Sequence, residues 1–139
     1  MKSISKILVI FMTAVTAGCW AIAITSRVFE IYDYSIFNVC YSSSTSSSEI
    51  RLKGMSRHSA MGVYKIETLQ IDKTLRVIAH GALVNKYNPE EVKGELDYKL
   101  SIPHSVDMIT FGNENTIILD RRNDYPSDRA WKYGEEVKK

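Results

Sequence analysis

The clearest pattern in the chain is a strict alternation of apolar and polar residues over 95–102. Successive side chains of a strand point to opposite faces of its sheet, so this alternation predicts a strand with one buried and one solvated face. Pro103 cannot donate to a sheet ladder and predicts the end of the strand. The positions predicted to face the core are Leu96, Tyr98, Leu100 and Ile102.

Two pairs of apolar segments have the spacing of β-hairpins. In the first pair only Asp72 and Lys73 separate two stretches rich in β-branched and aromatic residues. In the second pair the connection is 112–115, Gly-Asn-Glu-Asn, whose residue types suit the positive φ of a tight turn. The two predicted hairpins are 63–71 with 74–84, and 106–111 with 116–119.

Residues 28–41 are also dense in β-branched and aromatic residues. They predict one strand or two, or an outward extension of a preceding helix before a strand begins. The serine-rich stretch 42–48 cannot bury apolar area and is either a linker or an exposed loop. A linker places the start of the domain near Glu49, and a loop places it near Val28. The loop is favoured, because the apolar residues of 28–41 need a surface to pack against.

The fold class follows from the number and spacing of these segments. Beyond the N-terminus no stretch of ten or more residues has a helical apolar stripe. Six to seven short strands over 28–120 predict an all-β or β-rich domain, either a small antiparallel sandwich or a half-open barrel. Residues 88–91 predict a turn or a single helical turn. Residues 121–139 are charged and mixed in sign, and are interpreted as a partly disordered tail that Tyr125 and Trp131 could dock on the sheet.

The segment 1–26 directs the chain to a membrane. Lys2 and Lys6 precede 18 uncharged residues, 7–24. At 1.5 Å per residue these make a helix of about 27 Å, close to the roughly 30 Å of a hydrocarbon core. Positive charge stays on the cytoplasmic side, so the N-terminus is predicted to face the cytoplasm and the domain the periplasm.

Three interpretations of this segment share that destination. An uncleaved anchor makes the protein a single-pass protein of the inner membrane. A cleaved signal peptide, with small residues three and one positions before the cut in 21–23 or 15–17, releases a periplasmic protein. The sequence Thr-Ala-Gly-Cys at 16–19 resembles a bacterial lipobox at its Ala-Gly-Cys end, which implies a lipid on Cys19. Thr16 departs from that pattern, which has Leu, Val or Ile at this position.

Charge and cysteine content exclude several classes of protein. Of 18 basic residues two precede residue 27, and the other 16 balance the 16 acidic ones, so residues 27–139 have no net charge. Nucleic-acid binding through a polycationic surface is therefore excluded. Cys19 and Cys40 are too few for a disulfide framework and form no C-x-x-C pair. Cys40 is interpreted as a buried small hydrophobe, with an intermolecular bond as the alternative.

The three histidines, His58, His80 and His104, do not form a recognisable motif. There is no H-E-x-x-H, and no two lie within five residues of each other. A zinc site assembled from distant strands is geometrically allowed, but surface or capping histidines are favoured, with His58 the most exposed. A Ser–His–Asp set could be written with His104 and Asp107, yet no G-x-S-x-G elbow is present. We therefore predict no catalytic residue, no metal site and no cofactor.

Other charged and aromatic groups have an ordinary interpretation beside a functional one. The carboxylate pairs at 90–91 and 135–136 are adjacent and point apart, unlike an acid–base pair. Arg121 and Arg122 could hold a phosphate or a carboxylate, but a solvated charge pair is favoured. Two aromatic groups could bind a partner, although packing of the domain and its rim is favoured. The groups are Tyr32, Tyr34, Phe37 and Tyr41, and Tyr125, Trp131 and Tyr133.

These observations favour a small non-catalytic protein of the bacterial envelope. It would contact the membrane through 7–24 and bind another envelope protein, an envelope component or itself. A lysine-flanked anchor followed by a small β domain with a serine tract resembles many small envelope proteins of Gram-negative bacteria. The alternative is a small extracytoplasmic hydrolase or metal-dependent enzyme built on His58, His80 or His104. Convergence of two of these imidazoles with a carboxylate would favour the enzyme.

Overall fold

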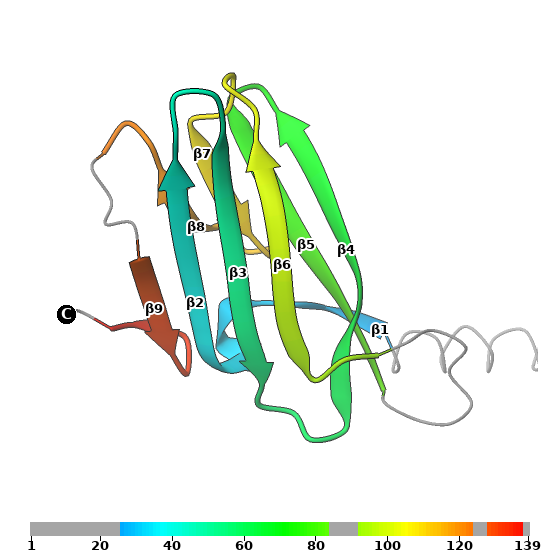
Figure 1. Ribbon diagram of the computed structural model, residues 1–139. Coiled ribbons are helices and arrows are strands. Elements are labelled where there is room, and N and C mark those ends of the chain that lie inside the picture. Colours follow the sequence, from blue (N-terminus) through cyan, green and yellow to red (C-terminus); the bar gives the residue numbers. More distant parts are fainter. Residues whose placement is uncertain (1–25, 84–91, 124–127, 138–139) are drawn as a thin grey trace, which may run out of the picture.

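The computed structural model describes residues 26–83, 92–123 and 128–137. In these ranges the chain forms a β-rich fold of two five-stranded sheets packed face to face (Figure 1). The predicted β-rich class is therefore confirmed, and the arrangement is sandwich-like rather than a closed barrel. The predicted membrane helix lies almost wholly outside the described residues. No helix within those ranges is long and apolar enough to cross a membrane.

Each sheet combines strands from distant parts of the chain. Sheet A contains β1 (Ser26–Phe29), β4 (Met61–Ile71), β5 (Thr74–Leu83), β7 (Met108–Phe111) and β8 (Thr116–Asp120). Sheet B contains β2 (Tyr34–Ser43), β3 (Ser48–Ser56), β6 (Glu95–Ile102), β9 (Asp128–Lys132) and β10 (Glu135–Glu136). A single 3-10 turn, η1 (Ile31–Asp33), carries the chain from β1 in sheet A to β2 in sheet B.

The two sheets differ in the way their strands pair. Sheet B has the order β10-β9-β2-β3-β6 and is antiparallel throughout. In sheet A, β4 lies along one edge of β5, while β1 and β7 share the other edge. The pair β5–β7 is parallel, in contrast to the antiparallel prediction. This pairing arises because β6 intervenes in sheet B, and a crossover of this kind is what two parallel neighbours require.

The predicted hairpins and the alternating strand are confirmed. The structure has a strand over 95–102, with Leu96 and Ile102 buried. Asp72 and Lys73 join β4 to β5, and Asp72 has a φ of 54°. At the β7–β8 turn Gly112 has a φ of 76°. Turn chemistry and period-two patterning thus determined these elements locally.

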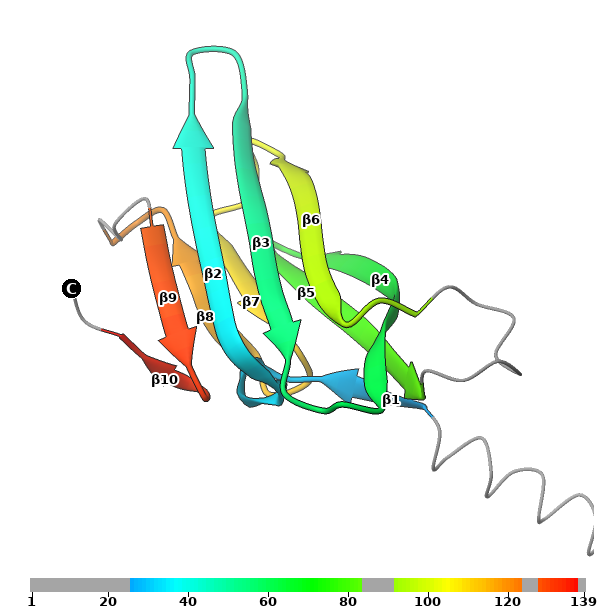
Figure 2. The same ribbon diagram turned by 60° about the horizontal axis from the view of Figure 1, so that its bottom comes forward.

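The segment 28–41 forms two strands that lie in opposite sheets. β1 pairs with β5, while β2 pairs with β3 and β9. Figure 2 shows β1 at the lower end of the sandwich, leading into the start of β2. The serine-rich stretch makes the β2–β3 hairpin turn, in which the Ser44 amide donates to the Ser47 carbonyl at 2.8 Å. It is a loop and not a linker.

The end of the chain differs from the predicted tail. Residues 128–136 form β9 and β10 at the edge of sheet B. Trp131 is 4% exposed and packs edge-to-face on Phe37, with ring centroids 5.8 Å apart. The Arg129 guanidinium binds both carboxylate oxygens of Glu136, at 2.9 and 2.7 Å. The buried aromatic, the bidentate ion pair and the antiparallel ladder between β2 and β9 together hold this charged segment against the sheet.

The core between the sheets is apolar and rich in aromatic residues. Phe37 and Phe111 come from opposite sheets, and their ring centroids lie 4.9 Å apart. The other large fully buried side chains include Phe29, Tyr34, Ile50, Leu52 and Ile118. Cys40 is free and exposed, so the expectation of a buried thiol was wrong. Val39 takes the inward position, which puts its neighbour Cys40 on the solvent side of β2.

Candidate functional site

The three histidines lie in separate places. His58 Nε2 is 2.8 Å from Asp33 Oδ1, and His80 Nε2 is 3.1 Å from Glu67 Oε2. His104 is exposed in the β6–β7 connection, whereas His58 is half-buried, so the expectation that His58 is the most exposed was wrong. Among the residues with described positions no two imidazoles share a carboxylate, and no three His, Cys, Asp or Glu side chains could hold a metal ion.

A serine lies close to the His58–Asp33 pair but is not positioned as a nucleophile. Ser56 Oγ accepts from the backbone amide of His58 at 3.2 Å and donates to the Met61 carbonyl at 3.0 Å. These bonds belong to the β3–β4 connection and do not reach the imidazole ring. Within the described ranges no hydrogen bond joins His104 to Asp107. In the described residues no two imidazoles therefore converge on a carboxylate, which is the arrangement that would favour the hydrolase.

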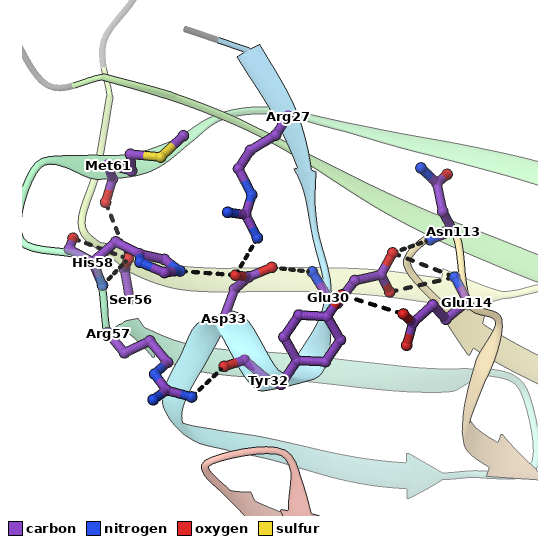
Figure 3. A network of polar contacts seen from close by, with 10 residues as sticks. All are labelled: Arg27, Glu30, Tyr32, Asp33, Ser56, Arg57, His58, Met61, Asn113 and Glu114. Atoms are coloured by element: carbon purple, nitrogen blue, oxygen red, sulfur yellow. Dashed lines mark hydrogen bonds and ion pairs between the residues drawn. The ribbon is translucent and has the colours of Figure 1, made fainter. Parts of the chain in front are cut away.

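A network of polar side chains closes one end of the sandwich (Figure 3). At its centre is the carboxylate of Asp33, which is 2% exposed. Its Oδ2 accepts from the Glu30 backbone amide at 2.8 Å, and its Oδ1 is bound by the Arg27 guanidinium and the His58 ring. A buried carboxylate is stable only when such donors surround it. Here Arg27, His58 and the Glu30 amide surround the carboxylate of Asp33.

A second buried carboxylate extends this network to the β7–β8 turn. Glu30 Oε1 accepts from the backbone amides of Asn113 at 2.7 Å and Glu114 at 3.3 Å. Burial raises the pKa of Glu30 despite these two bonds. A Cβ atom added to Gly112 would lie 1.8 Å from Glu30 Oε2. Glycine is thus needed at 112 for the approach of this carboxylate as well as for the backbone angle.

We call this set of residues the closed end: Arg27, Glu30, Asp33, His58 and the 112–114 turn. It joins β1, η1, the β3–β4 connection and the β7–β8 turn, as Figure 3 shows. Two further bonds strengthen the link, since Arg57 Nη1 donates to the Tyr32 carbonyl at 3.1 Å and Tyr32 Oη donates to Glu114 at 3.2 Å. Both buried carboxylates accept hydrogen bonds from donors of the chain itself. The closed end therefore holds the fold together.

One side of the sandwich differs from the closed end. On this side β4 and β6 are the outermost strands of the two sheets (Figure 1). On this side the backbone of Val63 in β4 exchanges hydrogen bonds of 2.9 and 3.0 Å with that of Lys93, two residues before β6. Beside this bridge lies an open groove of about 740 Å³. Its lining includes Ile66 from β4 and both Leu96 and Tyr98 from β6.

The backbone of β6 is paired on one side only. All eight residues of β6 are in register with β3, without a bulge. In the described part of the chain no strand pairs with its other edge. The other sheet edges are interrupted or short: β4 has a register shift between Val63 and Lys65, β8 has five residues and β10 has two. An unbroken free edge of this length is a template for strand pairing.

The side chains of β6 separate cleanly into two faces. Tyr98 and Leu100 point inward and pack against the core but are only half-buried, because no strand of the described ranges lies beyond them. Asp97 and Lys99 point outward. The Arg51 guanidinium binds Asp97 at 2.9 and 2.8 Å, and this hydrogen-bonded pair lowers the pKa of Asp97. We call β4, β6 and the groove between them the open edge.

The other predicted candidates take part in internal contacts. Tyr34, Phe37 and Trp131 are buried in the core, whereas Tyr32 and Tyr133 are 43% and 56% exposed. Arg122 Nε lies 3.4 Å from Asp120, and the Arg121 guanidinium lies 6.0 Å from the ring centroid of Tyr41. In the 135–136 pair, Glu136 binds Arg129 and does not face a second carboxylate. Three predicted candidates, Cys19, Tyr125 and the pair 90–91, lie outside the described residues.

Sequence reasoning missed both the closed end and the open edge. The spacing Glu30-x-x-Asp33 is that of a capping box, and this signal could have identified the first turn of the closed end. No comparable signal marks β6 as an edge strand, because edge position depends on the pairing of the whole sheet. Comparison with protein-family models, curated proteins and solved structures finds no match to this chain.

Proposed function

We propose that this protein is a non-catalytic binding module of the bacterial envelope, which takes an extended polypeptide segment at its open edge. The observation that carries this proposal is the free edge of β6, eight residues long and without a bulge, beside a groove of about 740 Å³. A binding role fits this surface better than a reaction does, since the lining of the groove contains no histidine and combines apolar and charged side chains beside a free strand edge.

The chemistry of binding follows from the free edge. A segment added beside β6 would satisfy backbone amides and carbonyls that now face solvent. Alternate side chains of that segment would enter the groove and cover Tyr98 and Leu100, which are half-buried. The bridge between Val63 of β4 and Lys93, two residues before β6, supports the groove on both sides without a partner. Because the edge is preformed, the domain itself loses little conformational entropy when a strand binds.

The location of the module rests on the N-terminal segment. We propose that residues 1–26 hold it in the inner membrane, with the N-terminus cytoplasmic and the domain periplasmic. The alternatives are release into the periplasm by cleavage and anchoring through a lipid on Cys19. Lys2 and Lys6 before the apolar run 7–24 support this orientation. β1 begins at Ser26, two residues after the run ends, so an uncleaved anchor would hold the domain at the membrane surface.

Site-specific photocrosslinking in the full-length chain tests the proposal. A photoreactive phenylalanine analogue replaces Tyr98 in the groove or, as the control, Ile36 on the outer face of sheet B, which is 51% exposed. Irradiation of cells should give a discrete polypeptide adduct at position 98 and none at 36. A bulky Ile66→Trp change on the far wall of the groove should reduce the adduct. Adducts at 36 alone, or at neither position, would contradict the proposed function.

A further inference from the structure

We infer that the segment bound at the open edge is β6 of a second copy of this chain, paired antiparallel about a two-fold axis at Tyr98. This inference rests on the proposed function and names its partner. The two copies would join their B sheets edge to edge into one continuous sheet. Such an interface is isologous, since the same strand supplies both sides.

The requirement that inward side chains stay inward limits the possible registers. In an antiparallel pair, directly opposite residues point to the same face, so an odd-numbered residue of β6 must face an odd-numbered residue of the other copy. Three registers with the axis near the middle of the strand satisfy this condition. They place the two-fold axis at Asp97, at Tyr98 or at Lys99.

Charge distinguishes these three registers. An axis at Asp97 sets Asp97 against its own copy, and an axis at Lys99 sets Lys99 against its own copy, so both bring like charges together. An axis at Tyr98 sets Asp97 opposite Lys99 of the second copy, twice by symmetry. Arg51 already holds the Asp97 carboxylate on the outer face of the sheet, with bonds of 2.9 and 2.8 Å. Lys99 is exposed and has no ion-pair partner in the described ranges.

The inward face is also complementary in this register. Tyr98 meets its own copy at the axis, and Leu96 lies opposite Leu100 of the second copy. Tyr98 and Leu100 are the half-buried side chains that pack on the core at this edge, so pairing would complete their burial. The apolar side chains of the second copy would extend the groove wall formed by Ile66 and Leu96.

The other free edges are less suited to self-pairing. On β4 the register shift beside Tyr64 interrupts the ladder, and Glu67 already binds Lys65 of the same strand at 2.6 Å. β8 and β10 are short, with five and two residues. Among these edges β6 alone has an unbroken ladder of eight residues. It also has charges that become complementary when two copies pair, because Asp97 of each copy faces Lys99 of the other.

Charge exchange between two differently tagged full-length chains tests the pairing. Asp97→Lys alone places two lysines opposite two lysines, and Lys99→Asp alone places two aspartates opposite two aspartates. Each should lower co-purification with its own copy by about tenfold, since like charges directly opposite each other on paired strands are destabilising. Mixing one Asp97→Lys chain with one Lys99→Asp chain restores opposite charges at both pairs, and recovery should return to within about twofold of wild type.

A disulfide experiment gives a second measurement that does not alter these charges. With Cys19 and Cys40 replaced by serine, Tyr98→Cys places two thiols opposite each other at the axis, with Cβ atoms about 5 Å apart. Mild oxidation should give a disulfide-linked dimer. Ser101→Cys, three residues along the same strand, faces Glu95 of the second copy and should give none.

The outcomes separate this inference from the proposed function. Wild-type chains that do not co-purify, single variants that co-purify like wild type, or folded variants whose mixture stays apart would each overturn the β6 pairing. If a charge variant fails to fold, the contrast between Tyr98→Cys and Ser101→Cys decides, and equal linkage in these two variants overturns the pairing. A photoadduct at position 98 with a different polypeptide overturns the self-pairing alone. The absence of any adduct overturns the proposed function itself.

Discussion

The closed end and the open edge of this sandwich use polar groups in opposite ways. At the closed end the carboxylates of Asp33 and Glu30 are 2% and 5% exposed, and donors from the chain itself surround each one. Along the open edge the backbone of β6 is paired on one side only. The first arrangement holds the two sheets together, and the second leaves bonding capacity for a partner. The proposed function therefore assigns stability and recognition to different parts of one small domain.

This separation makes the two regions respond differently to substitution. Changes at the closed end should lower the free energy of unfolding, because they leave buried donors or acceptors without partners. Changes on the outward face of β6 should leave folding intact and alter association. Either response found in the wrong region would break the comparison.

The largest expected effect is that of Asp33→Ala. Without the carboxylate, the Glu30 amide loses its acceptor, and Arg27 and His58 lose their partner. Unfolding in urea should show a loss of about 3 kcal/mol in the free energy of unfolding. Asp97→Ala, which also removes an ion-paired carboxylate but from an exposed site, is the matched control and should leave the urea midpoint unchanged. Equal losses would mean that the closed end does not hold the fold.

Gly112→Ala should have the next largest effect. Its φ of 76° disfavours any side chain, and the added Cβ would meet the Glu30 carboxylate. We expect a loss of about 2 kcal/mol in the free energy of unfolding, measured by thermal or urea denaturation. Gly94→Ala is the control, since an added Cβ there has no atom within 4 Å. A neutral Gly112→Ala variant would contradict the fit between the turn and Glu30.

His58→Ala compares a histidine that binds a buried carboxylate with an exposed one. The substitution removes the ring that binds Asp33 and packs edge-to-face on Phe29 at 6.1 Å. The expected loss is about 1 kcal/mol in the free energy of unfolding. His104→Ala, at an exposed position in the β6–β7 connection, should leave the urea midpoint unchanged. The reverse order of effects would remove His58 from the closed end.

The smallest effect expected is a change in the pH dependence of stability at Glu30. Burial raises its pKa above the ordinary value of 4.5, so the folded protein holds this proton more tightly than the unfolded chain does. Stability from this group is therefore greatest at low pH and falls as the pH rises from 4.5 through the higher pKa of the folded state.

The side chain of the Glu30→Gln variant cannot ionise, so its contribution to stability should not decrease as the pH rises. The difference in the free energy of unfolding between Glu30→Gln and wild type should shift in favour of the variant as the pH rises through that range. Carboxylates with lowered pKa values, such as Asp97 and Asp120, act in the opposite direction but are present in both proteins and cancel. A difference that is constant with pH would contradict the raised pKa of Glu30.

Much of the fold was predictable, because its signals are local. The alternation over 95–102 and the residue types in the 112–115 turn act between neighbours in sequence. The parts of the fold that the sequence left open depend on long-range pairing. Docking by Trp131 was expected as a possibility, but its partner Phe37 in β2 is distant in the sequence. The parallel pair β5–β7 was not expected and depends on where β6 lies.

The candidate site was less predictable for the same reason. Asp33 lies 25 residues from His58, and Glu30 lies 83 residues from Asn113, so their contacts exist only after folding. The inward face of β6 was visible in the sequence, but its free edge was not. Alternation identifies which side chains face the core and is silent on whether a neighbouring strand covers them.

Amide hydrogen exchange of the full-length chain tests the assignment of binding to the open edge most directly. The exchange is compared between cell membranes, where the proposed anchor would concentrate the chain, and dilute purified protein. Amides of β6 that point away from β3 should exchange slowly in membranes and quickly after dilution, whereas the Glu30 amide, held by Asp33 at 2.8 Å, should exchange slowly in both. Fast exchange of these β6 amides in both states would contradict the open edge as the binding site.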